Sequence, residues 1–314
     1  MQRILVIRPG ALGDTILTLP ALAALRAAFP GAHLTFAGNP PLLPLLRGSA
    51  YADAVISIDD AALTPLFAPL EQPSLPLAPC LAGLDLAVLW LGDSAAVAGH
   101  LRRLGARAVV AARSRQPAES RRHAADYLLA TLAPALPARA SRAEAPYPRL
   151  SLSAEQRAFA ERFSWQHRLS GRLVAAIHPG SGGRWKCWPA ARFAALADRL
   201  AGRGMAILLV VGPADDETAG AFVAALRVAR PLVARGLALA NLAAVLSLCA
   251  VFVGNDSGVS HLAAALGVPT VAVYGPTDPL VWGVRGERVA LLRGERLEVV
   301  SVAEVQAAVD TLLL

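Results

Sequence analysis

Short apolar runs alternate with segments of helical periodicity along most of this 314-residue chain. In the first half, residues 14–29 have the pattern of a helix. Strands are predicted for the runs ILVIR (4–8), LTFAG (34–38), AVISI (54–58) and LDLAVLWL (84–91). Buried strands separated by helices are typical of doubly wound parallel sheets. The pattern therefore predicts an α/β fold.

The same alternation restarts after residue 150 and continues to the end of the chain. Strands are predicted at 174–179, 206–212, 231–235, 251–255 and 270–275, and helices at 153–165, 189–202, 214–229, 239–248, 257–266 and 301–313. The stretch PALPARASRAEAPYPRLS (134–151) between the halves has the composition of an interdomain linker. A chain of this length usually forms two domains. We therefore predict two Rossmann-like domains, 1–150 and 151–314, that face a central cleft.

Composition narrows the class of protein. Hydrophobic residues make up 55% of the chain and charged residues 17%, which is typical of a compact globular protein. The three cysteines are too widely spaced for a disulfide framework or a zinc site, and the N-terminal apolar run is too short for a signal peptide. The uncharged windows 236–255 and 258–277 are long enough to cross a bilayer. The first is broken by Asn241 and a change of period near Cys249, and the second by His261, Gly267 and Pro269. We expect each to be a buried helix followed by a buried strand, in a cytoplasmic protein.

Positive charge is concentrated in one part of the first domain. The chain has a formal net charge of +7, and the only acid between residues 102 and 122 is Glu119. The arginines of this segment are Arg102, Arg103, Arg107, Arg113, Arg115, Arg121 and Arg122. They form either a solvated surface or a binding site for an anionic partner. Nucleic acid is the less favoured partner, because no aromatic residues interleave with the charges.

Three loops carry candidate chemistry, and the first is RPGALGDTILTLPAL (8–22). It follows a predicted strand, and Asp14 stands where a helix begins. A carboxylate there can cap the helix, or it can act as a general base at the carboxyl end of the strand. Gly10 and Gly13 do not make the G-x-G-x-x-G pattern of dinucleotide-binding proteins, which disfavours an NAD-dependent oxidoreductase.

The second loop is HPGSGGRWKCWP (178–189), which again follows a predicted strand. Its glycines let backbone N–H groups approach phosphate oxygens, and Ser181 adds a hydroxyl donor. Lys186 is the only lysine among thirty Lys and Arg residues, so a charge alone does not explain it. The loop does not match the Walker A pattern. We expect Trp185 and Trp188 to be packing residues rather than residues whose rings stack on a ligand.

The third loop, in GNDSGVSHLAAALGVPTVAVYGPTDP (254–279), joins a strand to a helix. Ser257 and Gly258 open that helix, whose first backbone N–H groups and dipole favour an anion. Asp256 either caps the helix or binds sugar hydroxyls, and the pattern does not distinguish these roles. His261 falls one turn further along the helix, near the same ligand.

In this order and at these separations, the three loops resemble glycosyltransferase family 9, the heptosyltransferase family of lipopolysaccharide assembly. The resemblance extends over most of the chain and rests on PGALGDTILTLPAL, HPGSGGRWKCWP and NDSGVSHLAAALGVPTVAVYGPTDP. It implies a GT-B fold, in which two Rossmann-like domains hold the active site between them. It also places the final helix, 301–313, back on the first domain.

The resemblance assigns roles to individual residues. Asp14 matches the proposed catalytic base, Lys186 the lysine that contacts the sugar nucleotide, and Asp256 the acid that binds the donor. The remaining candidate donor contacts are Gly180, Ser181, Ser257, Gly258 and His261. Leu237, in the loop before helix 239–248, is a candidate backbone contact to adenine, which the resemblance does not supply. Gly13, Arg121 and Arg122 are candidate acceptor contacts. Some members have consecutive threonines where this chain has Gly180 and Ser181, and a basic residue where it has Cys187, which leaves the exact donor and acceptor open.

The implied activity is inverting, metal-independent transfer of heptose from ADP-heptose to a lipopolysaccharide core acceptor of the Kdo-lipid A type. The expected partners are a nucleotide sugar and an anionic glycolipid at the inner membrane surface, with no nucleic acid, no cofactor and no metal. We expect a monomer that is cytoplasmic or peripheral to the inner membrane. Two alternatives remain: a family 9 transferase with another nucleotide sugar or a protein acceptor, and a non-catalytic GT-B-like protein that binds sugar nucleotides.

Overall fold

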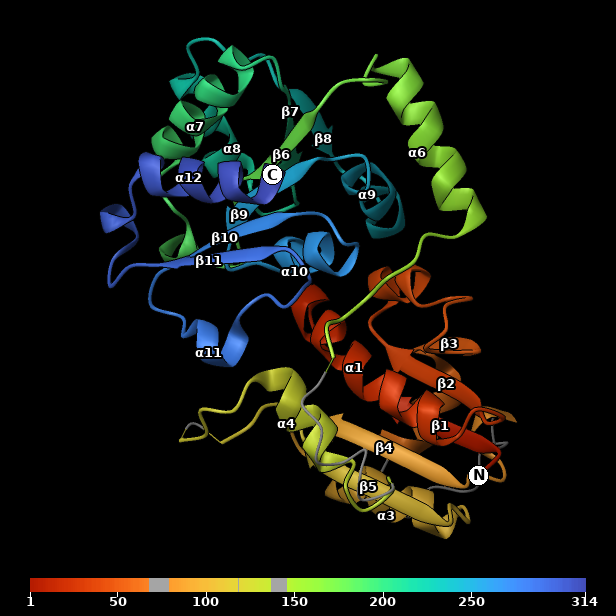
Figure 1. Ribbon diagram of the computed structural model, residues 1–314. Helices are drawn as coiled ribbons and strands as arrows, with labels where there is room; N and C mark the ends of the chain where they lie inside the picture. The colour runs from red at the N-terminus through yellow and green to blue at the C-terminus, as the bar shows by residue number, and fades with distance from the viewer. Residues whose placement is uncertain (68–78, 118, 137–145) are drawn as a thin grey trace. The chain divides into compact units, whose positions relative to one another are not determined.

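A computed structural model describes residues 1–67, 79–117, 119–136 and 146–314. The chain divides into two compact units, Met1–Pro146 and Tyr147–Leu314. Much of the expected linker at 134–151 lies outside the described residues. Each unit is built around its own parallel sheet (Figure 1).

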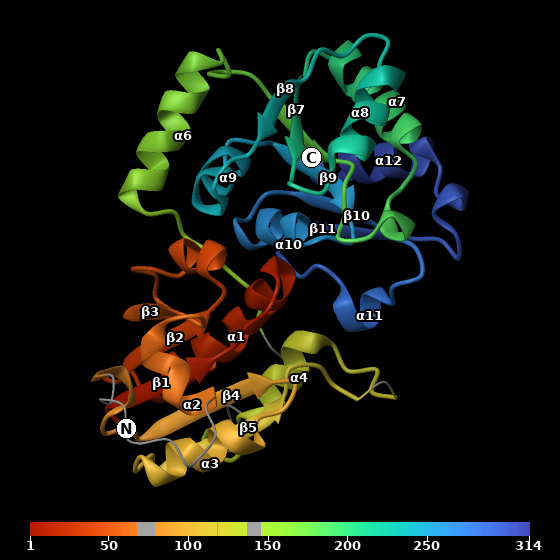
Figure 2. The same ribbon diagram turned by 180° about the vertical axis from the view of Figure 1, so that it is seen from behind.

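The described part of unit 1 holds a parallel sheet of order β3-β2-β1-β4-β5. Its strands are β1 (Arg3–Ile7), β2 (His33–Gly38), β3 (Ala54–Ser57), β4 (Leu86–Leu91) and β5 (Ala108–Arg113). Its helices are α1 (Leu12–Ala28), α2 (Thr64–Phe67), α3 (Ala95–Arg103) and α4 (Ala124–Thr131). Helices α1 and α4 pack together on one face of the sheet, and α2 and α3 cover the other (Figure 2).

The sheet of unit 2 is also parallel, with the order β11-β10-β9-β6-β7-β8. Its strands are β6 (Val174–His178), β7 (Ala206–Val211), β8 (Leu232–Arg235), β9 (Val251–Asn255), β10 (Thr270–Tyr274) and β11 (Val289–Arg293). Its helices are α6 (Ala154–Gln166), α7 (Ala190–Gly202), α8 (Asp216–Ala225), α9 (Leu239–Leu246), α10 (Gly258–Ala265), α11 (Pro279–Trp282) and α12 (Val302–Leu313). Helices α7, α8 and α12 cover one face, and α6, α9 and α10 lie on the opposite side (Figure 1).

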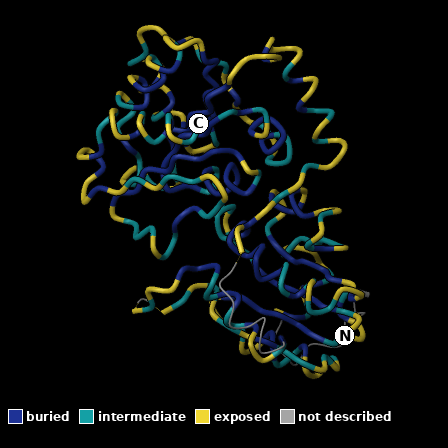
Figure 3. Tube along the Cα trace, viewed as in Figure 1, coloured by how far each residue is buried: buried dark blue, intermediate teal, exposed yellow. Residues whose placement is uncertain are grey.

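The central strands explain why apolar runs predicted the fold. Residues of β1, β4, β6, β7, β9 and β10 are almost all buried on both faces (Figure 3). A strand covered on both faces needs a continuous apolar run rather than an alternating one. The two strands that the pattern missed, β5 and β11, lie at sheet edges and are only partly buried.

The two long apolar windows fold as expected into buried helix–strand pairs. The first contains α9 and β9, and the second contains α10 and β10. Across the described ranges, no helix is long and apolar enough to cross a membrane. The last helix, α12, buries Val305 and Val309 against α7 and the strands β9–β11 of unit 2. Its expected contact with the first domain stays a prediction.

Candidate functional site

The strand orders identify one preferred position for a ligand in each sheet. In unit 2, β7 and β8 follow β6 on one side of the sheet and β9, β10 and β11 follow on the other, so the strand order switches sides between β6 and β9. In unit 1, the same switch falls between β1 and β4. In doubly wound sheets, ligands bind outside the carboxyl ends of the strands at such a switch point. His178 ends β6 and Asn255 ends β9, so the second and third motif loops both leave the sheet at the switch point of unit 2.

Asn255 ties these two loops together from inside the core. This fully buried amide donates to the carbonyls of Pro179 (2.8 Å) and Gly180 (3.1 Å), and its oxygen accepts from the N–H of Trp188 (2.8 Å). Both ends of the loop at 179–188 are therefore fixed to the end of β9. A Cβ at residue 180 would overlap the Asp215 carboxylate, which explains why glycine occupies that position.

Lys186 lies in this fixed loop and pairs with Asp256. The Lys186 Nζ is 2.7 Å from Asp256 Oδ2 and 5.1 Å from the centre of the Trp185 ring. The Ser181 hydroxyl donates to the main-chain oxygen of Asp256 at 2.7 Å. The ammonium is thus held between an aromatic face and a carboxylate. A compact ammonium suits this position better than the wider, planar guanidinium of arginine.

The two tryptophans of the loop have different environments. Trp188 is fully buried, donates its indole N–H to the Val300 carbonyl at 2.9 Å and packs edge-on against Phe193, as a packing role predicts. The expectation that Trp185 is also a packing residue is wrong, because this residue is 62% exposed. Gly183 and the short 3-10 turn at Arg184–Lys186 carry Trp185 out of the core.

Helix α10 begins beside the Lys186–Asp256 pair. Its N-cap is Ser257, whose hydroxyl accepts from the Ser260 N–H at 3.4 Å. Asp256 therefore does not cap this helix, and its carboxylate is directed to Lys186 instead. Gly258 is the first helical residue, and its N–H belongs to the first turn, where the helix dipole favours anions. His261 is buried within the same helix.

A buried histidine–aspartate pair lies behind these loops. His178 Nε2 is 2.9 Å from Asp215 Oδ2, and His178 Nδ1 is 3.3 Å from the Ser257 hydroxyl. Burial raises the pKa of Asp215, but the hydrogen bond from His178, the charge of His178 and the Gly212 N–H outweigh it, so this pKa lies below its ordinary value. The sequence interpretation gave neither residue a role. A histidine at the end of a buried strand was the available signal.

Unit 1 carries a second buried pair, between Arg8 and Asp14. Arg8 directly follows β1 and is 3% exposed, and its Nη2 donates to Asp14 Oδ1 at 3.0 Å. Burial lowers the pKa of the Arg8 guanidinium, and the Asp14 carboxylate opposes that shift. Asp14 was expected to begin helix α1, but the N-cap is Ala11 and Asp14 is the third helical residue. Its Oδ2 still accepts the Ala11 N–H, at 3.1 Å, so the carboxylate does cap the helix from within.

The other predicted residues lie apart from these contacts. Gly13 is the second residue of α1, and Leu237 is half-buried between β8 and α9. Arg121 and Arg122 are exposed in the segment that precedes α4. The seven arginines between 102 and 122 come from α3, β5 and the loops around them, so they do not share one helix face.

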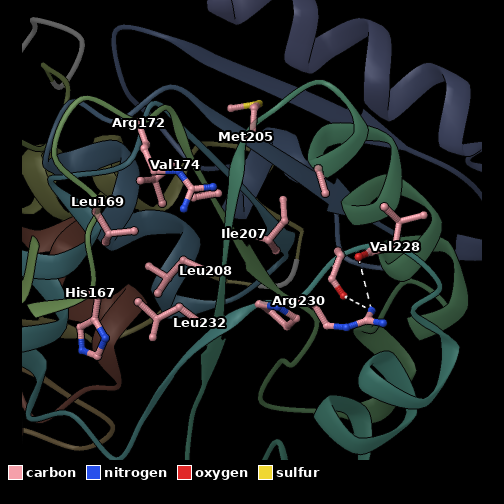
Figure 4. A pocket seen from close by; sticks show the side chains of 14 residues that line it. His167, Leu169, Arg172, Val174, Met205, Ile207, Leu208, Val228, Arg230 and Leu232 are labelled. Carbon is pink, nitrogen blue, oxygen red and sulfur yellow. Dashed lines mark hydrogen bonds between the residues drawn. The ribbon is translucent and has the colours of Figure 1, made fainter.

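A cavity in unit 2 lies at the other end of the sheet. Its volume is about 460 Å³, and it is lined by residues from the beginnings of β6, β7 and β8, including Arg172, Arg230 and His167 (Figure 4). Arg230 donates to its neighbouring carbonyls of Val228 and Ala229. This cavity is separate from the motif loops. In the parts of the chain that the structure describes, no three His, Cys, Asp or Glu side chains are grouped so as to hold a metal.

Comparisons with known proteins agree with the resemblance of the motif loops. Lipopolysaccharide heptosyltransferase 3 of Escherichia coli is 30% identical over 166 residues, which cover 47% of this chain and 49% of that protein. Lipopolysaccharide heptosyltransferase 1 of Pseudomonas aeruginosa is 42% identical over 102 residues, which cover 32% of this chain and 28% of that protein. The chain thus spans about half or less of the length of these curated relatives.

Solved structures match over nearly the whole chain. A family 9 glycosyltransferase from Veillonella parvula DSM 2008 has a TM-score of 0.82 at 24% identity, covering 99% of this chain and 97% of that one. The E. coli heptosyltransferase WaaC with ADP has a TM-score of 0.70 at 22% identity, covering 99% and 100%. The iron-containing dodecameric glycosyltransferase TibC of enterotoxigenic E. coli has a TM-score of 0.56 at 15% identity, covering 99% and 76%.

These likenesses confirm the GT-B fold, with a Rossmann-like parallel sheet in each unit. The model of glycosyltransferase family 9 (heptosyltransferase) matches residues 96–308, which is more than half of the chain. The protein is therefore a member of glycosyltransferase family 9.

Proposed function

We propose that this protein transfers heptose from ADP-heptose to a lipopolysaccharide core acceptor of the Kdo-lipid A type. The observation that carries the proposal is the Lys186–Asp256 pair at the switch point of unit 2, beside the N-terminus of α10. A cation, hydroxyl groups and a helix N-terminus suit a diphosphate, and a nearby carboxylate suits sugar hydroxyls. The names of the relatives support heptose as the sugar.

In the donor complex, Lys186 and Ser181 hold the diphosphate together with the first N–H groups of α10 at Ser257 and Gly258. Gly180 lets the backbone approach the phosphate oxygens closely. Asp256 accepts hydrogen bonds from the heptose hydroxyls, and His261 completes the same side of the site. Leu237 is assigned to adenine through its main chain.

Asp14 acts as the general base in the proposed reaction. It accepts the proton of the acceptor hydroxyl as that oxygen attacks the anomeric carbon of heptose. The bond from the anomeric carbon to the phosphate oxygen breaks on the opposite side, so the configuration inverts and ADP leaves with the bonding electron pair. Arg8 holds the Asp14 carboxylate in one orientation. The cation and N–H groups of the donor site stabilise the negative charge that develops on ADP.

The acceptor is proposed to bind unit 1 near Gly13 and Asp14, with Arg121 and Arg122 facing its anionic groups. A phosphorylated lipid acceptor resides in a membrane, so the protein would work at the inner membrane surface from the cytoplasmic side. Electrostatic attraction to such a surface is screened by salt, which makes this part measurable. We further propose that the enzyme is a monomer.

We also propose that transfer needs no metal ion. The sequence has no D-x-D pattern, since its acidic pairs Asp59–Asp60 and Asp215–Asp216 are adjacent. Lys186 and the α10 N-terminus supply positive potential at the leaving group, which is the task that a divalent cation performs in metal-dependent glycosyltransferases.

Binding of nucleotide sugars to the full-length protein tests the donor assignment. Isothermal titration with ADP-heptose, ADP-glucose, GDP-mannose, UDP-glucose and CDP-activated sugars should give the highest affinity for ADP-heptose. Preference for another base would favour a family 9 transferase with a different donor. Tight binding of ADP-heptose without donor hydrolysis, and without transfer to any lipid or protein acceptor, would favour a non-catalytic binding protein.

A further inference from the structure

His178 joins two loops that come from different strands. It ends β6, which pairs with β7 on one side and β9 on the other. Its Nε2 reaches Asp215, in the loop after β7, at 2.9 Å. Its Nδ1 reaches Ser257, in the loop after β9, at 3.3 Å. One buried ring therefore connects the two loops on either side of the switch point.

Hydrogen bonds hold both nitrogens of the His178 ring. Asp215 Oδ2 also accepts the Gly212 N–H at 2.7 Å, and the low pKa of Asp215 keeps the carboxylate charged, so His178 donates from Nε2. Nδ1 of the same ring lies 3.3 Å from the Ser257 hydroxyl, so the ring also holds that side chain in place. Ser260 cannot supply a proton to Ser257 from its hydroxyl, because that hydroxyl donates to the Asn255 carbonyl at 2.5 Å.

This arrangement determines how Ser257 acts at the start of α10. Its hydroxyl oxygen accepts the Ser260 N–H and lies within hydrogen-bond distance of both His178 Nδ1 and the Ser260 hydroxyl. Ser257 is thus held as the N-cap, which leaves the earlier N–H groups of the helix for a ligand. On the other side, the Asp215 carboxylate lies against Gly180, where a side chain would collide with it.

A role in packing alone does not explain this pair. His178 and Asp215 are 3% and 5% exposed, and burying two polar groups costs free energy that an apolar pair of similar volume would not. The pair also lies at the carboxyl end of the sheet, where Gly180 and Ser257 flank it, rather than in the middle of the core.

We propose that His178 and Asp215 are positioning residues for nucleoside diphosphate binding. His178 holds Ser257, and through it the N-terminus of α10, while Asp215 fixes the ring and the Gly180 turn. The inference rests on the proposed donor site in unit 2. Neither residue touches the substrate in this account, and both act through the main chain that does.

Two substitutions at residue 178 separate the links that the ring makes. His178→Asn keeps an amide near the position of Nδ1 and so retains a partner for Ser257. His178→Gln places its amide near the position of Nε2 and so retains a partner for Asp215. The probe is ADP, titrated calorimetrically into the full-length protein, with the melting temperature of each variant measured alongside.

We expect His178→Asn to bind ADP within about threefold of the unsubstituted protein, and His178→Gln to bind about tenfold more weakly. Tenfold corresponds to about 1.4 kcal/mol, which is the size of one net hydrogen bond. Asp215→Ala should also weaken ADP binding. The matched control is Asp198→Ala, which removes a carboxylate that accepts three backbone N–H groups at residues 227–229, before β8. It should lower the melting temperature and leave ADP affinity unchanged.

The outcomes distinguish this inference from the proposed function. If the unsubstituted protein does not bind ADP, the donor site itself is wrong. If it binds ADP but the affinities of the variants simply follow their melting temperatures, including that of Asp198→Ala, the positioning role is overturned. Equal affinity of His178→Asn and His178→Gln would also overturn it, because only one of them keeps the link to Ser257.

Discussion

Replacing Lys186 by Met tests the donor site at its most informative contact. Methionine keeps much of the side-chain volume and removes the ammonium, which lies 2.7 Å from Asp256 Oδ2. In the proposed complex, the lost interaction is a charge-assisted hydrogen bond to phosphate, and hydrogen bonds to charged groups contribute about 1.5–3 kcal/mol. The dissociation constant of ADP should therefore rise by roughly 10- to 150-fold.

Folding stability should change much less than ADP affinity. The Lys186 and Asp256 side chains are 26% and 10% exposed, and partly solvated pairs of this kind contribute about 1 kcal/mol or less. Lys186→Arg keeps the charge but places a planar group in the space between Trp185 and Asp256. We expect it to recover only part of the affinity for ADP.

The double variant Lys186→Met with Asp256→Asn decides between two explanations for weak binding. If Lys186 only neutralises Asp256, removing both charges should restore ADP affinity, since ADP carries no heptose for Asp256 to bind. If Lys186 contacts the diphosphate, the double variant should remain as weak as Lys186→Met. Calorimetric titration of the four proteins with ADP gives the answer, and recovery of full affinity in the double variant would refute the contact.

Four further results are expected. Asp14→Asn should abolish transfer and leave ADP affinity within about threefold of that of the unsubstituted protein, a factor worth about 0.7 kcal/mol. Loss of ADP binding in this variant would contradict a role confined to proton transfer. Transfer should persist in EDTA, and strict dependence on added Mg²⁺ or Mn²⁺ would refute the metal-free mechanism. The KM for a phosphorylated acceptor should rise with salt concentration, and the double variant Arg121→Gln with Arg122→Gln should lose this salt dependence. If the double variant keeps it, these arginines belong to a solvated surface and do not bind the acceptor. Burial raises the pKa of Asp215, but the contacts with His178 and the Gly212 N–H lower it by more, so this pKa lies below the ordinary value of 3.8. The stability that ionised Asp215 contributes is therefore present above pH 3.8 and is lost as the pH falls through the folded-state pKa. The melting-temperature deficit of Asp215→Asn should therefore shrink below pH 3.8, and a deficit that is constant with pH would contradict this assignment.

The sequence was sufficient to predict most of the fold, because the buried parallel strands are continuous apolar runs. Strand β9 was predicted at its observed limits, and most other predicted elements differ from the observed ones by no more than two residues at either end. The missed strands β5 and β11 are partly exposed edge strands whose apolar runs, AVVAA and VALL, each end at an arginine. Strand order could not be read from periodicity, since periodicity reports burial and not which strands pair.

The candidate site was predictable only where local chemistry stands out along the chain. Lys186 and Asp256 stood out as a lone lysine and as an acid before a helix, and the structure brings them within 2.7 Å. The roles of His178 and Asp215 depend on a contact between residues 37 positions apart, which no local pattern reports. Arg8 was passed over for a similar reason, because its burial beside Asp14 is a property of the folded sheet and not of the sequence around it.

The most direct test of the account is the transfer reaction itself. The purified protein is incubated in EDTA with ADP-heptose and a Kdo-lipid A acceptor, and the products are followed by mass spectrometry. The account predicts one heptose added per acceptor, an equal amount of ADP released, an inverted anomeric configuration in the product, and no product with Asp14→Asn. Transfer by Asp14→Asn at the rate of the unsubstituted protein, or no transfer by the unsubstituted protein from a donor that it binds, would contradict it.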